Sequence, residues 1–248
     1  MRKRVSCCTG CIFFLAAIVG CKKDATENIP SNSTGVVKGK ITDAAGHPLA
    51  GVKVTIEHTV WYANYVYAQT NGNGEYSAAL PGEPAGDWTA KAQMEKTIYG
   101  QTYQFDLDPS SADPFTKSGA VRNFTWKVNG KRPGDNGYYG AHADLYAFGT
   151  DIDVSNIKLV FTPADNVLID GSTAVSIERS IQDVAGTFMA TDIPIGKYTV
   201  KAVYAGKTLL LENRHDDNGP AVSKEVIFGK NGTLGETEYN IEFWVSEE

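Results

Sequence analysis

Apolar residues alternate with polar ones along most of the chain downstream of residue 35, with a period of two residues. The segments 37–41, 52–56 and 124–128 each carry apolar residues or glycine at every second position, with polar residues between them. No segment of this region keeps apolar residues at the i, i+3, i+4 and i+7 spacing of an amphipathic helix over three turns. Period-two alternation is typical of strands that bury one face, and turn residues separate the runs. The pattern therefore predicts an all-β protein made of antiparallel β-sandwiches.

A longer pattern repeats in the two halves of this region. Residues 74–92 contain a strand that begins Gly-Glu-Tyr, a proline corner and a second strand that opens with Trp88. Residues 186–202 contain the same order, with Gly-Thr-Phe in the first strand and Tyr198 opening the second. Repetition of this kind favours two related sandwiches in tandem, although strands and corners look alike in many β proteins.

Length and turn residues place the boundaries of the predicted domains. About 215 residues follow residue 34, enough for two domains of about 100 residues each. The stretch KRPGDNG, residues 131–137, is the richest in turn residues between the two halves. We therefore expect one sandwich over residues 35–130, a linker over residues 131–137 and a second sandwich over residues 138–248.

The first 20 residues have the pattern of a bacterial lipoprotein signal peptide. Three basic residues precede the apolar run 12–19, which is much shorter than the ~20 residues that span a bilayer. The sequence IVGC, which ends at Cys21, resembles a lipobox. We expect Cys21 to become the lipidated N-terminus and residues 21–34 to form a flexible tether. An ordinary signal peptide followed by a chance cysteine is the alternative.

Cysteine usage and charge limit the chemistry of the mature chain. All four cysteines lie in the leader or at its end: Cys7, Cys8, Cys11 and Cys21. The mature domains therefore contain no disulfide, cysteine nucleophile or thiolate metal site. Loss of three basic leader residues changes the formal net charge from −6 to −9 (−6 − 3), which argues against nucleic acid as a partner.

The stretch GKITDAAGHPLAGVKVTI, from Gly39 to Ile56, predicts a tight hairpin whose turn is fixed by glycines and Pro48. Together with TNGNGEY, residues 70–76, it resembles the carboxypeptidase regulatory-like domain over residues 35 to roughly 129. The resemblance implies a transthyretin-like, seven-stranded β-sandwich for the first domain, and the second half lacks the hairpin signature. The order of lipobox, one such domain and a second β region is similar to envelope lipoproteins of Bacteroidetes-like bacteria. This similarity implies attachment to the outer membrane, facing either the periplasm or the cell surface.

The sequence lacks the motifs of the enzymes that this resemblance suggests. A zinc carboxypeptidase needs a glutamate three residues after a histidine, and none of the four histidines has one: His47, His58, His142 and His215. There is no Gly-x-Ser-x-Gly elbow and no phosphate-binding loop. We therefore expect no enzymatic activity, no cofactor and no resident metal, and a peptidase-associated regulatory factor is a lower-ranked alternative.

Two polar segments are candidate cation sites. Residues 151–156 place oxygen donors at alternate positions, but they lack the central glycine and the final glutamate of an EF-hand. A loop that caps its own backbone is the favoured interpretation of this segment. Residues 214–219, RHDDNG, would bind a cation or a sugar hydroxyl, or simply form a solvated loop, which is favoured.

Aromatic residues give the strongest indication of a binding surface. Trp61, Tyr62, Tyr65 and Tyr67 lie close together in one segment, and Trp244 is out of phase with the apolar residues around it. Because a sandwich strand has a single inward face, some of these rings should be exposed or lie at an interface. Exposed rings would form platforms for sugars or protein partners, and the alternative is packing between the two domains.

These observations predict a non-enzymatic envelope lipoprotein whose β-sandwiches serve as a structural or interaction module. The chain would reach the membrane through its N-terminal lipid, and a glycan or an envelope protein is the expected class of partner. The alternative is a carbohydrate-binding accessory lipoprotein of a glycan-uptake system, with the five aromatic residues as its candidate ligand-binding residues.

Overall fold

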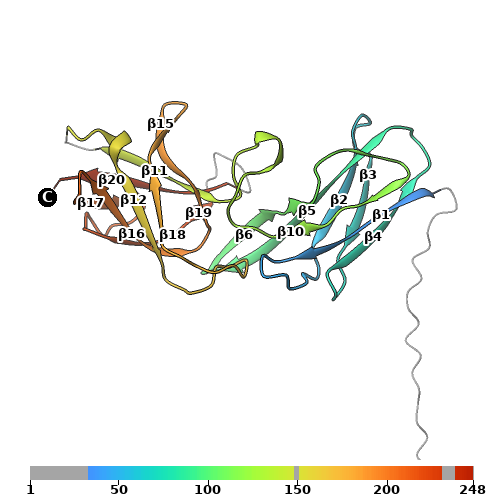
Figure 1. The fold of residues 1–248 in the computed structure, drawn as a ribbon, viewed down its shortest axis with the longest axis horizontal. Helices are drawn as coiled ribbons and strands as arrows, with labels where there is room; N and C mark the ends of the chain where they lie inside the picture. Colours follow the sequence, from blue (N-terminus) through green and yellow to red (C-terminus); the bar gives the residue numbers. More distant parts are fainter. Residues whose placement is uncertain (1–32, 148–150, 231–237, 248) are drawn as a thin grey trace, which may run out of the picture.

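The computed structural model describes residues 33–147, 151–230 and 238–247 of the 248-residue chain. The predicted signal peptide, the lipidation site at Cys21 and most of the predicted tether therefore lie outside the described residues. Strands dominate the described part and form two β-sandwiches placed end to end (Figure 1). The all-β sandwich class predicted from the alternation is confirmed. The described chain begins at the outer end of the first sandwich and ends at the outer end of the second (Figure 1).

The first sandwich consists of two five-stranded sheets. One sheet has the order β4-β1-β10-β7 with β9 also paired to β1, and the other has the order β3-β2-β5-β6 with β8 paired to β5. The strands are β1 (Ser33–Thr42), β2 (Lys53–His58), β3 (Tyr65–Gln69), β4 (Glu75–Pro81), β5 (Asp87–Ile98), β6 (Gln101–Asp106), β7 (Asp108–Pro109), β8 (Phe115–Thr116), β9 (Gly119–Val121) and β10 (Phe124–Thr125). Most pairs are antiparallel as predicted, but β1 pairs in parallel with β9 and β10, a detail that a period of two residues does not report.

The second sandwich is built from one hydrogen-bonded sheet of ten strands that folds over on itself. The order is β13-β12-β16-β17-β20-β11-β15-β14, with β18 paired to β16 and β19 paired to β20. The strands are β11 (Ala141–Ala147), β12 (Lys158–Pro163), β13 (Ile177–Ser180), β14 (Gln182–Val184), β15 (Thr187–Ile193), β16 (Lys197–Tyr204), β17 (Lys207–Asn213), β18 (Lys224–Ile227), β19 (Gly229–Lys230) and β20 (Tyr239–Ser246). Two short 3-10 helices accompany them, η1 (Pro133–Asp135) and η2 (Val154–Asn156). The first half of β17 pairs with β16 and its second half pairs with β20, so this strand connects the two layers.

The two sandwiches share the same strand connectivity. The antiparallel pair β1·β4 corresponds to β11·β15, β2·β5 corresponds to β12·β16, and β5·β6 corresponds to β16·β17. The parallel pair β1·β10 corresponds to β11·β20. The repeat seen in the sequence falls on β4–β5 and β15–β16, and the aromatic residues that open β5 and β16, Trp88 and Tyr198, are both buried.

The predicted hairpin between Gly39 and Ile56 has a different form in the structure. Its two flanking runs, β1 and β2, lie in opposite sheets and do not pair. The connection contains its own small turn, in which Asp43 N donates to His47 O at 2.9 Å. Gly74 packs against this turn so closely that a Cβ atom there would lie 2.5 Å from Ile41 O, so the position requires glycine. The connection lies at the inner end of the first sandwich, facing the second.

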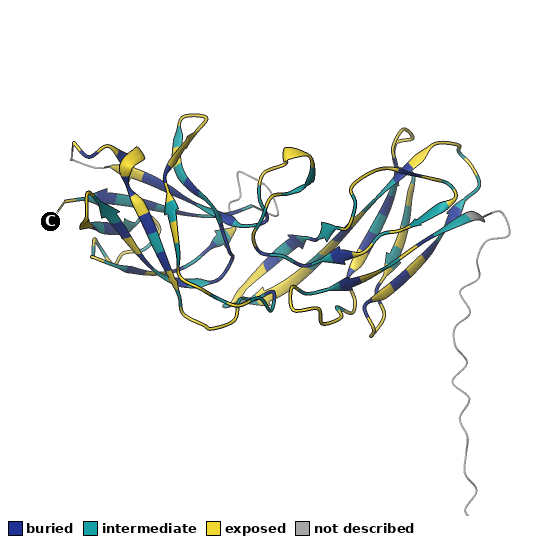
Figure 2. Ribbon diagram, in the orientation of Figure 1, coloured by how far each residue is buried: buried dark blue, intermediate teal, exposed yellow. Residues whose placement is uncertain are grey.

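Burial follows the alternation within individual strands (Figure 2). Along β20 every second residue is buried, namely Tyr239, Ile241, Phe243 and Val245, and the residues between them are half-buried. The same rule operates in β2, where Val54 and Ile56 face the core. Removal of these inward side chains from water is the main driving force for each sandwich.

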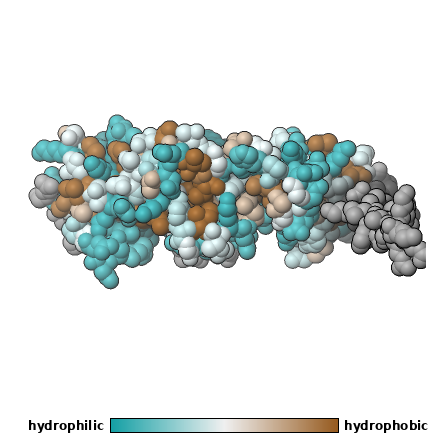
Figure 3. All heavy atoms as spheres, turned by 90° about the horizontal axis from the view of Figure 1, so that it is seen from below, coloured by the Kyte–Doolittle hydropathy of each residue, from teal (hydrophilic) through white to brown (hydrophobic). Residues whose placement is uncertain are grey.

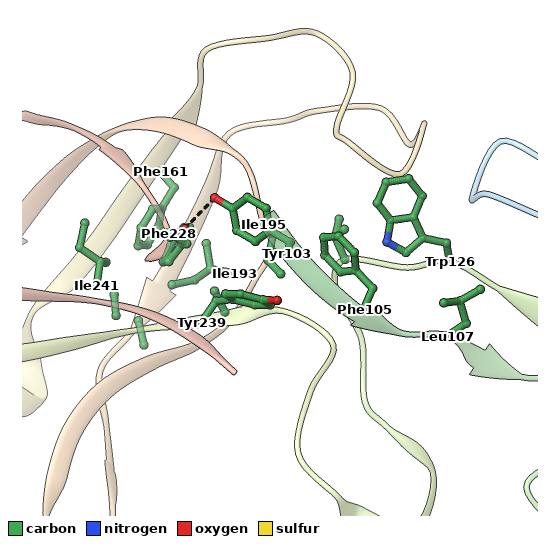
Figure 4. Packing of buried hydrophobic residues seen from close by; sticks show 14 of the residues in the cluster. Tyr103, Phe105, Leu107, Trp126, Phe161, Ile193, Ile195, Phe228, Tyr239 and Ile241 are labelled. Carbon is green, nitrogen blue, oxygen red and sulfur yellow. Dashed lines mark hydrogen bonds between the residues drawn. The ribbon is translucent and has the colours of Figure 1, made fainter. Parts of the chain in front are cut away.

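The two sandwiches share a hydrophobic core at their junction. The hairpin formed by β5 and β6 extends beyond the first sandwich toward the second (Figure 1) and carries Tyr103 and Phe105 (Figure 4). The ring centroids of Tyr103 and Tyr239 lie 5.0 Å apart, and those of Phe105 and Trp126 lie 5.1 Å apart. All four rings, together with Phe228, are at most 4% exposed. Burial of this much aromatic surface stabilises one arrangement of the two sandwiches.

Hydrogen bonds satisfy the polar groups inside this junction. The Tyr239 hydroxyl accepts from Gln104 N at 2.6 Å and donates to Gln104 O at 2.9 Å. The Tyr103 hydroxyl donates to Phe228 O at 2.8 Å, and burial raises the pKa of Tyr103 to about 12. The hydroxyl groups of both tyrosines therefore connect the two sandwiches, and that of Tyr103 remains neutral.

Residues 164–176, between β12 and β13, close the junction and are termed the junction loop. Asp170 in this loop is 1% exposed. Its backbone oxygen accepts from Ala44 N at 2.9 Å, and its carboxylate accepts from Val128 N at 3.2 Å. The carboxylate of Asp192 likewise accepts from Gly130 N at 2.7 Å. The second sandwich thus supplies acceptors for backbone N–H groups that the first leaves free.

The predicted linker, residues 131–137, forms a closed loop beside the junction. Arg132 pairs with Asp106 at 2.7 Å, and the Tyr139 hydroxyl donates to Asp108 at 3.1 Å. Both partners belong to the first sandwich. The segment is therefore fixed at both ends instead of spanning an open gap between the sandwiches.

Candidate functional site

Four of the five candidate binding residues lie together at the outer end of the first sandwich. Trp61 and Tyr62 are in the loop that joins β2 and β3, residues 59–64, which we term the tip loop, and Tyr65 and Tyr67 are on β3. The exposed fractions of Trp61, Tyr62, Tyr65 and Tyr67 are 57%, 97%, 37% and 59%. These rings face solvent and are not packed between the two sandwiches.

Trp244 lies elsewhere, on the outward face of β20 in the second sandwich. It is half-buried, and the Arg214 guanidinium lies 5.2 Å from its ring centroid and 4.8 Å from that of Tyr146. The structure therefore does not bring Trp244 together with the other four candidates. Tyr139, which is not one of the five candidates, is buried at the junction.

His58 organises the tip loop from beneath. Its side chain is 3% exposed, and its Nδ1 accepts hydrogen bonds from Val60 N and Trp61 N, each at 3.1 Å. Both bonds require an unprotonated Nδ1, which leaves the proton of the neutral ring on Nε2. Nε2 has no hydrogen-bond partner among the described residues. The ring thus leaves Nε2 without a hydrogen bond, while its Nδ1 holds the backbone of Val60 and Trp61, whose side chains are exposed.

The pocket around His58 is completed by residues from the start of β5. The His58 ring packs edge-on against Trp88, with centroids 4.9 Å apart. Gly86 has a φ of +145°, and a Cβ atom there would lie 2.6 Å from His58 Cε1. The absence of a side chain at Gly86 therefore makes room for the imidazole.

Tyr65 and Tyr67 form a second, flatter surface on β3, which we term the tyrosine platform. Their ring centroids lie 6.0 Å apart with an interplanar angle of 30°. The Glu57 carboxylate raises the pKa of Tyr65, so its hydroxyl stays neutral and can donate a hydrogen bond. Lys91 pairs with Glu57 at 3.2 Å, and the Lys53 ammonium lies 5.2 Å from the Tyr67 ring. Two exposed rings are therefore bordered by polar groups of both charge signs.

The candidate calcium loop at residues 151–156 uses its oxygen atoms internally. The Asp153 carboxylate accepts from Ser155 N at 3.0 Å, from Ser155 Oγ at 2.6 Å and from Asn156 Nδ2 at 2.8 Å. This geometry corresponds to the self-capping interpretation. In the described ranges, no group of three or more His, Cys, Asp or Glu side chains is placed to hold a metal ion.

The candidate polar loop at residues 214–219 is tied to neighbouring strands by ion pairs. Arg214 lies 2.5 Å from Glu242, and His215 lies 3.6 Å from the same carboxylate. Asp216 lies 3.6 Å from Lys224, which is 6% exposed. These contacts explain the loop as a structural connection.

A buried carboxylate on β11 was not singled out from the sequence. Asp144 is 7% exposed, and its Oδ2 accepts from Asn240 Nδ2 at 3.1 Å. Its Oδ1 lies 3.6 Å from His142 Nε2, and burial raises the pKa of Asp144 although His142 opposes the shift. No serine or threonine hydroxyl is hydrogen-bonded to either side chain in the described part, so this pair does not form a nucleophile–base arrangement.

His58 and Asp170 are the residues whose roles the sequence patterns did not reveal. His58 was considered only as a metal ligand, yet its spacing from Val54 and Ile56 continues the inward phase of β2 and would have placed its ring inside. Asp170 has no comparable signal, because its partners in the first sandwich, Ala44 and Val128, are more than 40 positions away in the sequence. No helix among the described residues is long and apolar enough to cross a bilayer.

The surface is mostly hydrophilic, with apolar atoms in small groups (Figure 3). One group lies near mid-length on the face seen from below (Figure 3). The junction loop has exposed valines of its own, Val167 at 57% and Val175 at 62%. The tip loop differs because it combines Val60, which is 77% exposed, with two adjacent aromatic rings.

Comparisons with known proteins give fold-level similarity only. No family model matches the chain, and no curated protein matches it in sequence. Among solved structures, the TIE protein of Bacillus anthracis is 13% identical, with a TM-score of 0.30, over 86% of this chain and 34% of that one. A streptococcal ancillary pilin is 12% identical, with a TM-score of 0.27, over 85% of this chain and 63% of the pilin. This chain thus spans less than two thirds of either protein.

A single B repeat unit of the collagen-binding surface protein of Staphylococcus aureus is also similar. It is 13% identical, with a TM-score of 0.24, over 86% of this chain and 99% of the repeat unit. Similarities of this size do not establish a shared family or activity. Membership of the carboxypeptidase regulatory-like family stays a prediction.

Proposed function

We propose that this protein is a non-enzymatic, lipid-anchored protein of the outer membrane, and that its two sandwiches act together as one rigid structural arm. The observation that supports the arm is the shared core at the junction, where Tyr103, Phe105 and Trp126 meet Phe228 and Tyr239. Neighbouring domains usually move relative to one another unless their contact is large and apolar. Here the contact is apolar at its centre and hydrogen-bonded at its edge.

The hydrogen bonds of the junction strengthen this proposal. Ala44, Val128 and Gly130 donate backbone N–H groups across the junction to Asp170 and Asp192. A hinge motion would break these bonds, and because Val128 is fully buried, leaving its N–H group without an acceptor would cost about 1–3 kcal/mol. The turn between β1 and β2 therefore contacts the second sandwich directly, through Ala44.

The rigidity can be measured with one spin label in each sandwich. Because the mature domains contain no cysteine, Ser77→Cys and Lys201→Cys introduce unique labelling sites on exposed strand positions. Double electron–electron resonance should give a single narrow distance distribution. The pair Ser77→Cys and Lys91→Cys, within the first sandwich, reports the width that the labels alone produce. A between-sandwich distribution much broader than this control would reject the rigid arm.

The anchor has its own test. Mass spectrometry of the protein isolated from native membranes should show acyl chains on the N-terminal Cys21, and Cys21→Ser should release the protein from the membrane fraction. An unacylated N-terminus would reject the membrane attachment and leave the rigid arm untouched.

Glycan binding is a second candidate function, and the tyrosine platform is the observation that favours it. A sugar ring stacks on an aromatic face, and its hydroxyl groups need polar partners at the edge of that face. Tyr65 and Tyr67 offer exposed faces, Glu57 and Lys91 lie near Tyr65, and the Lys53 ammonium lies over one face of Tyr67. Exposed rings with such neighbours suit a polysaccharide better than an apolar ligand.

A polysaccharide panel tests this candidate. Replacing both platform residues, Tyr65→Ala with Tyr67→Ala, should weaken binding about 5- to 160-fold, since two stacking contacts contribute about 1–3 kcal/mol together. Trp244→Ala is the matched control, because it removes a ring from the far sandwich and should leave binding unchanged. Equal losses in both variants, or no binding to any polysaccharide, would reject the platform as a glycan site.

A further inference from the structure

The tip loop lies at the same end of the first sandwich as the start of the described chain. The first residue of β1, Ser33, pairs with Pro81 at the end of β4. The last residue of β2, His58, pairs with Trp88 near the start of β5. Because residues 82–86 join β4 directly to β5, both pairs lie at one end of the sandwich (Figure 1). The chain that leads back to Cys21 therefore leaves the sandwich next to the tip loop.

The side chains at the apex of this loop are apolar or aromatic and exposed to solvent. Val60, Trp61 and Tyr62 are consecutive and 77%, 57% and 97% exposed. In the second sandwich the corresponding loop, between β12 and β13, contacts the first sandwich through the buried Asp170. An apolar patch on a surface loop marks a contact site, and adjacent Trp and Tyr rings are typical of the water–lipid interface, where one edge is apolar and the other is wet.

We propose that the tip loop rests in the headgroup region of the bilayer to which Cys21 is attached. This inference rests on the proposed lipidation of Cys21. Ser33 is twelve positions after Cys21 (33 − 21), so the sandwich cannot lie more than about 43 Å from its anchor along the chain. A tether of this length keeps the loop at a high effective concentration near the lipid, so a weak contact is sufficient.

Two features of the loop suit this contact. His58 already holds the backbone of Val60 and Trp61 in place, so binding orders few additional bonds. The neighbouring acidic side chains Glu83 and Asp87 are exposed at the same end, so attraction to anionic lipids is not the driving force. The contact should therefore be apolar and insensitive to salt. Its consequence is an arm that stands on its first sandwich and projects the second away from the membrane.

Fluorescence quenching in reconstituted vesicles tests the contact. The acylated full-length mature protein is placed in phosphatidylcholine vesicles whose acyl chains carry bromine near the headgroup. Of the four tryptophans, Trp88 and Trp126 are at most 1% exposed, and Trp244 lies in the other sandwich. We expect partial quenching that disappears in Trp61→Phe, persists in Trp244→Phe and does not change between low and high salt.

A second pair of variants keeps Trp61 as the probe. Val60→Ser with Tyr62→Ser should reduce the quenching at least about twofold, because it removes the apolar flanks of the loop. Val167→Ser with Val175→Ser makes a similar change on exposed positions of the junction loop and should leave the quenching intact. Absence of quenching in protein whose Cys21 is shown to be acylated overturns the contact and leaves the anchor standing. Quenching that is lost in Trp244→Phe also overturns the contact, as does protection of Trp61 by a glycan or protein without quenching. An unacylated Cys21 overturns both the contact and the anchor.

Discussion

The same connection, between the second and third long strands of each sandwich, has opposite fates in the two halves of the molecule. In the second sandwich it is the junction loop, whose Asp170 is buried against the first sandwich. In the first sandwich it is the tip loop, whose Tyr62 is almost fully exposed. Strand connectivity is shared, so the difference lies in loop length and chemistry. A sandwich end becomes an internal joint when its loop offers acceptors to a neighbour, and an outward contact surface when it offers apolar rings.

Polar groups are arranged differently at these two ends. The backbone oxygen and the carboxylate of Asp170 accept hydrogen bonds from N–H groups of the other sandwich. His58 instead directs its Nδ1 at the backbone of its own loop. The first arrangement binds two bodies together, and the second shapes one body for an external partner. Substitutions at the two ends should therefore differ in what they damage.

The largest effect is expected at the aromatic centre of the joint. Tyr239→Ala should lower the free energy of unfolding by about 3–5 kcal/mol, because Tyr239 is 2% exposed and its removal leaves a cavity. The substitution also removes the hydrogen bonds that its hydroxyl makes to the backbone N–H and C=O groups of Gln104. Urea unfolding of the purified protein measures this loss. Tyr62→Ala removes the same side chain at the free end and should change stability by less than about 0.5 kcal/mol. A loss of less than 1 kcal/mol in Tyr239→Ala would mean that the joint is not part of the core.

A smaller loss is expected from the junction loop. Asp170→Ala leaves the N–H groups of the buried Val128 and the half-buried Ser172 without their acceptors, and it should cost about 2–3 kcal/mol. The label-to-label distance between the sandwiches should also broaden. Ser176→Ala, in the same loop but exposed, serves as the control and should be nearly neutral. If both variants behave alike, the loop is a covering segment and not the joint.

Smaller still is the effect expected beneath the tip loop. Gly86→Ala introduces a Cβ atom 2.6 Å from the His58 ring at a backbone φ of +145°, and should cost about 1–2 kcal/mol. Because the displaced imidazole holds Trp61 N, acrylamide quenching of Trp61 should change as well. Gly72→Ala, where a Cβ atom meets nothing within 4 Å, is the control for adding a methyl group to a glycine of this sandwich. Unchanged quenching in Gly86→Ala would show that His58 does not shape the loop.

Sequence patterns predicted the interior of each sandwich better than its ends. The alternation around Trp244 correctly separated the buried residues of β20 from this outward ring, and the repeat pointed to β4–β5 and β15–β16. Period-two patterns report which face of a strand is inward, but they carry no information on what lies beyond a loop. The exposure of the Trp61 segment was therefore one of two open alternatives. Its separation from Trp244 depends on the end-to-end arrangement, which arises from contacts such as Ala44 with Asp170 that are distant in sequence.

The smallest expected effect concerns a pair of equivalent positions, Lys38 on β1 and Asp144 on β11. Lys38 pairs with Ser77, three residues after Gly74, and Asp144 pairs with Met189, three residues after Gly186. Despite this equivalence, Lys38 is exposed and Asp144 is buried. Burial raises the pKa of Asp144 above its value in the unfolded chain. Protonation therefore favours the folded state, a contribution that is complete below the unfolded pKa and is lost as the pH rises through the folded pKa.

At neutral pH the ionised Asp144 should thus be a small liability, despite the hydrogen bond from Asn240 and the nearby His142. Asp144→Asn should stabilise the protein at pH 7, and the difference should shrink as the pH falls through the raised pKa of Asp144 and vanish below the unfolded pKa. Urea unfolding across this range measures it, with the exposed Asp151→Asn as the control for loss of one negative charge. A variant that is less stable at pH 7 would show that the partners of the Asp144 carboxylate stabilise its charge more than burial destabilises it. The buried charge would then stabilise the second sandwich, whereas the equivalent charge of Lys38 in the first sandwich stays in water.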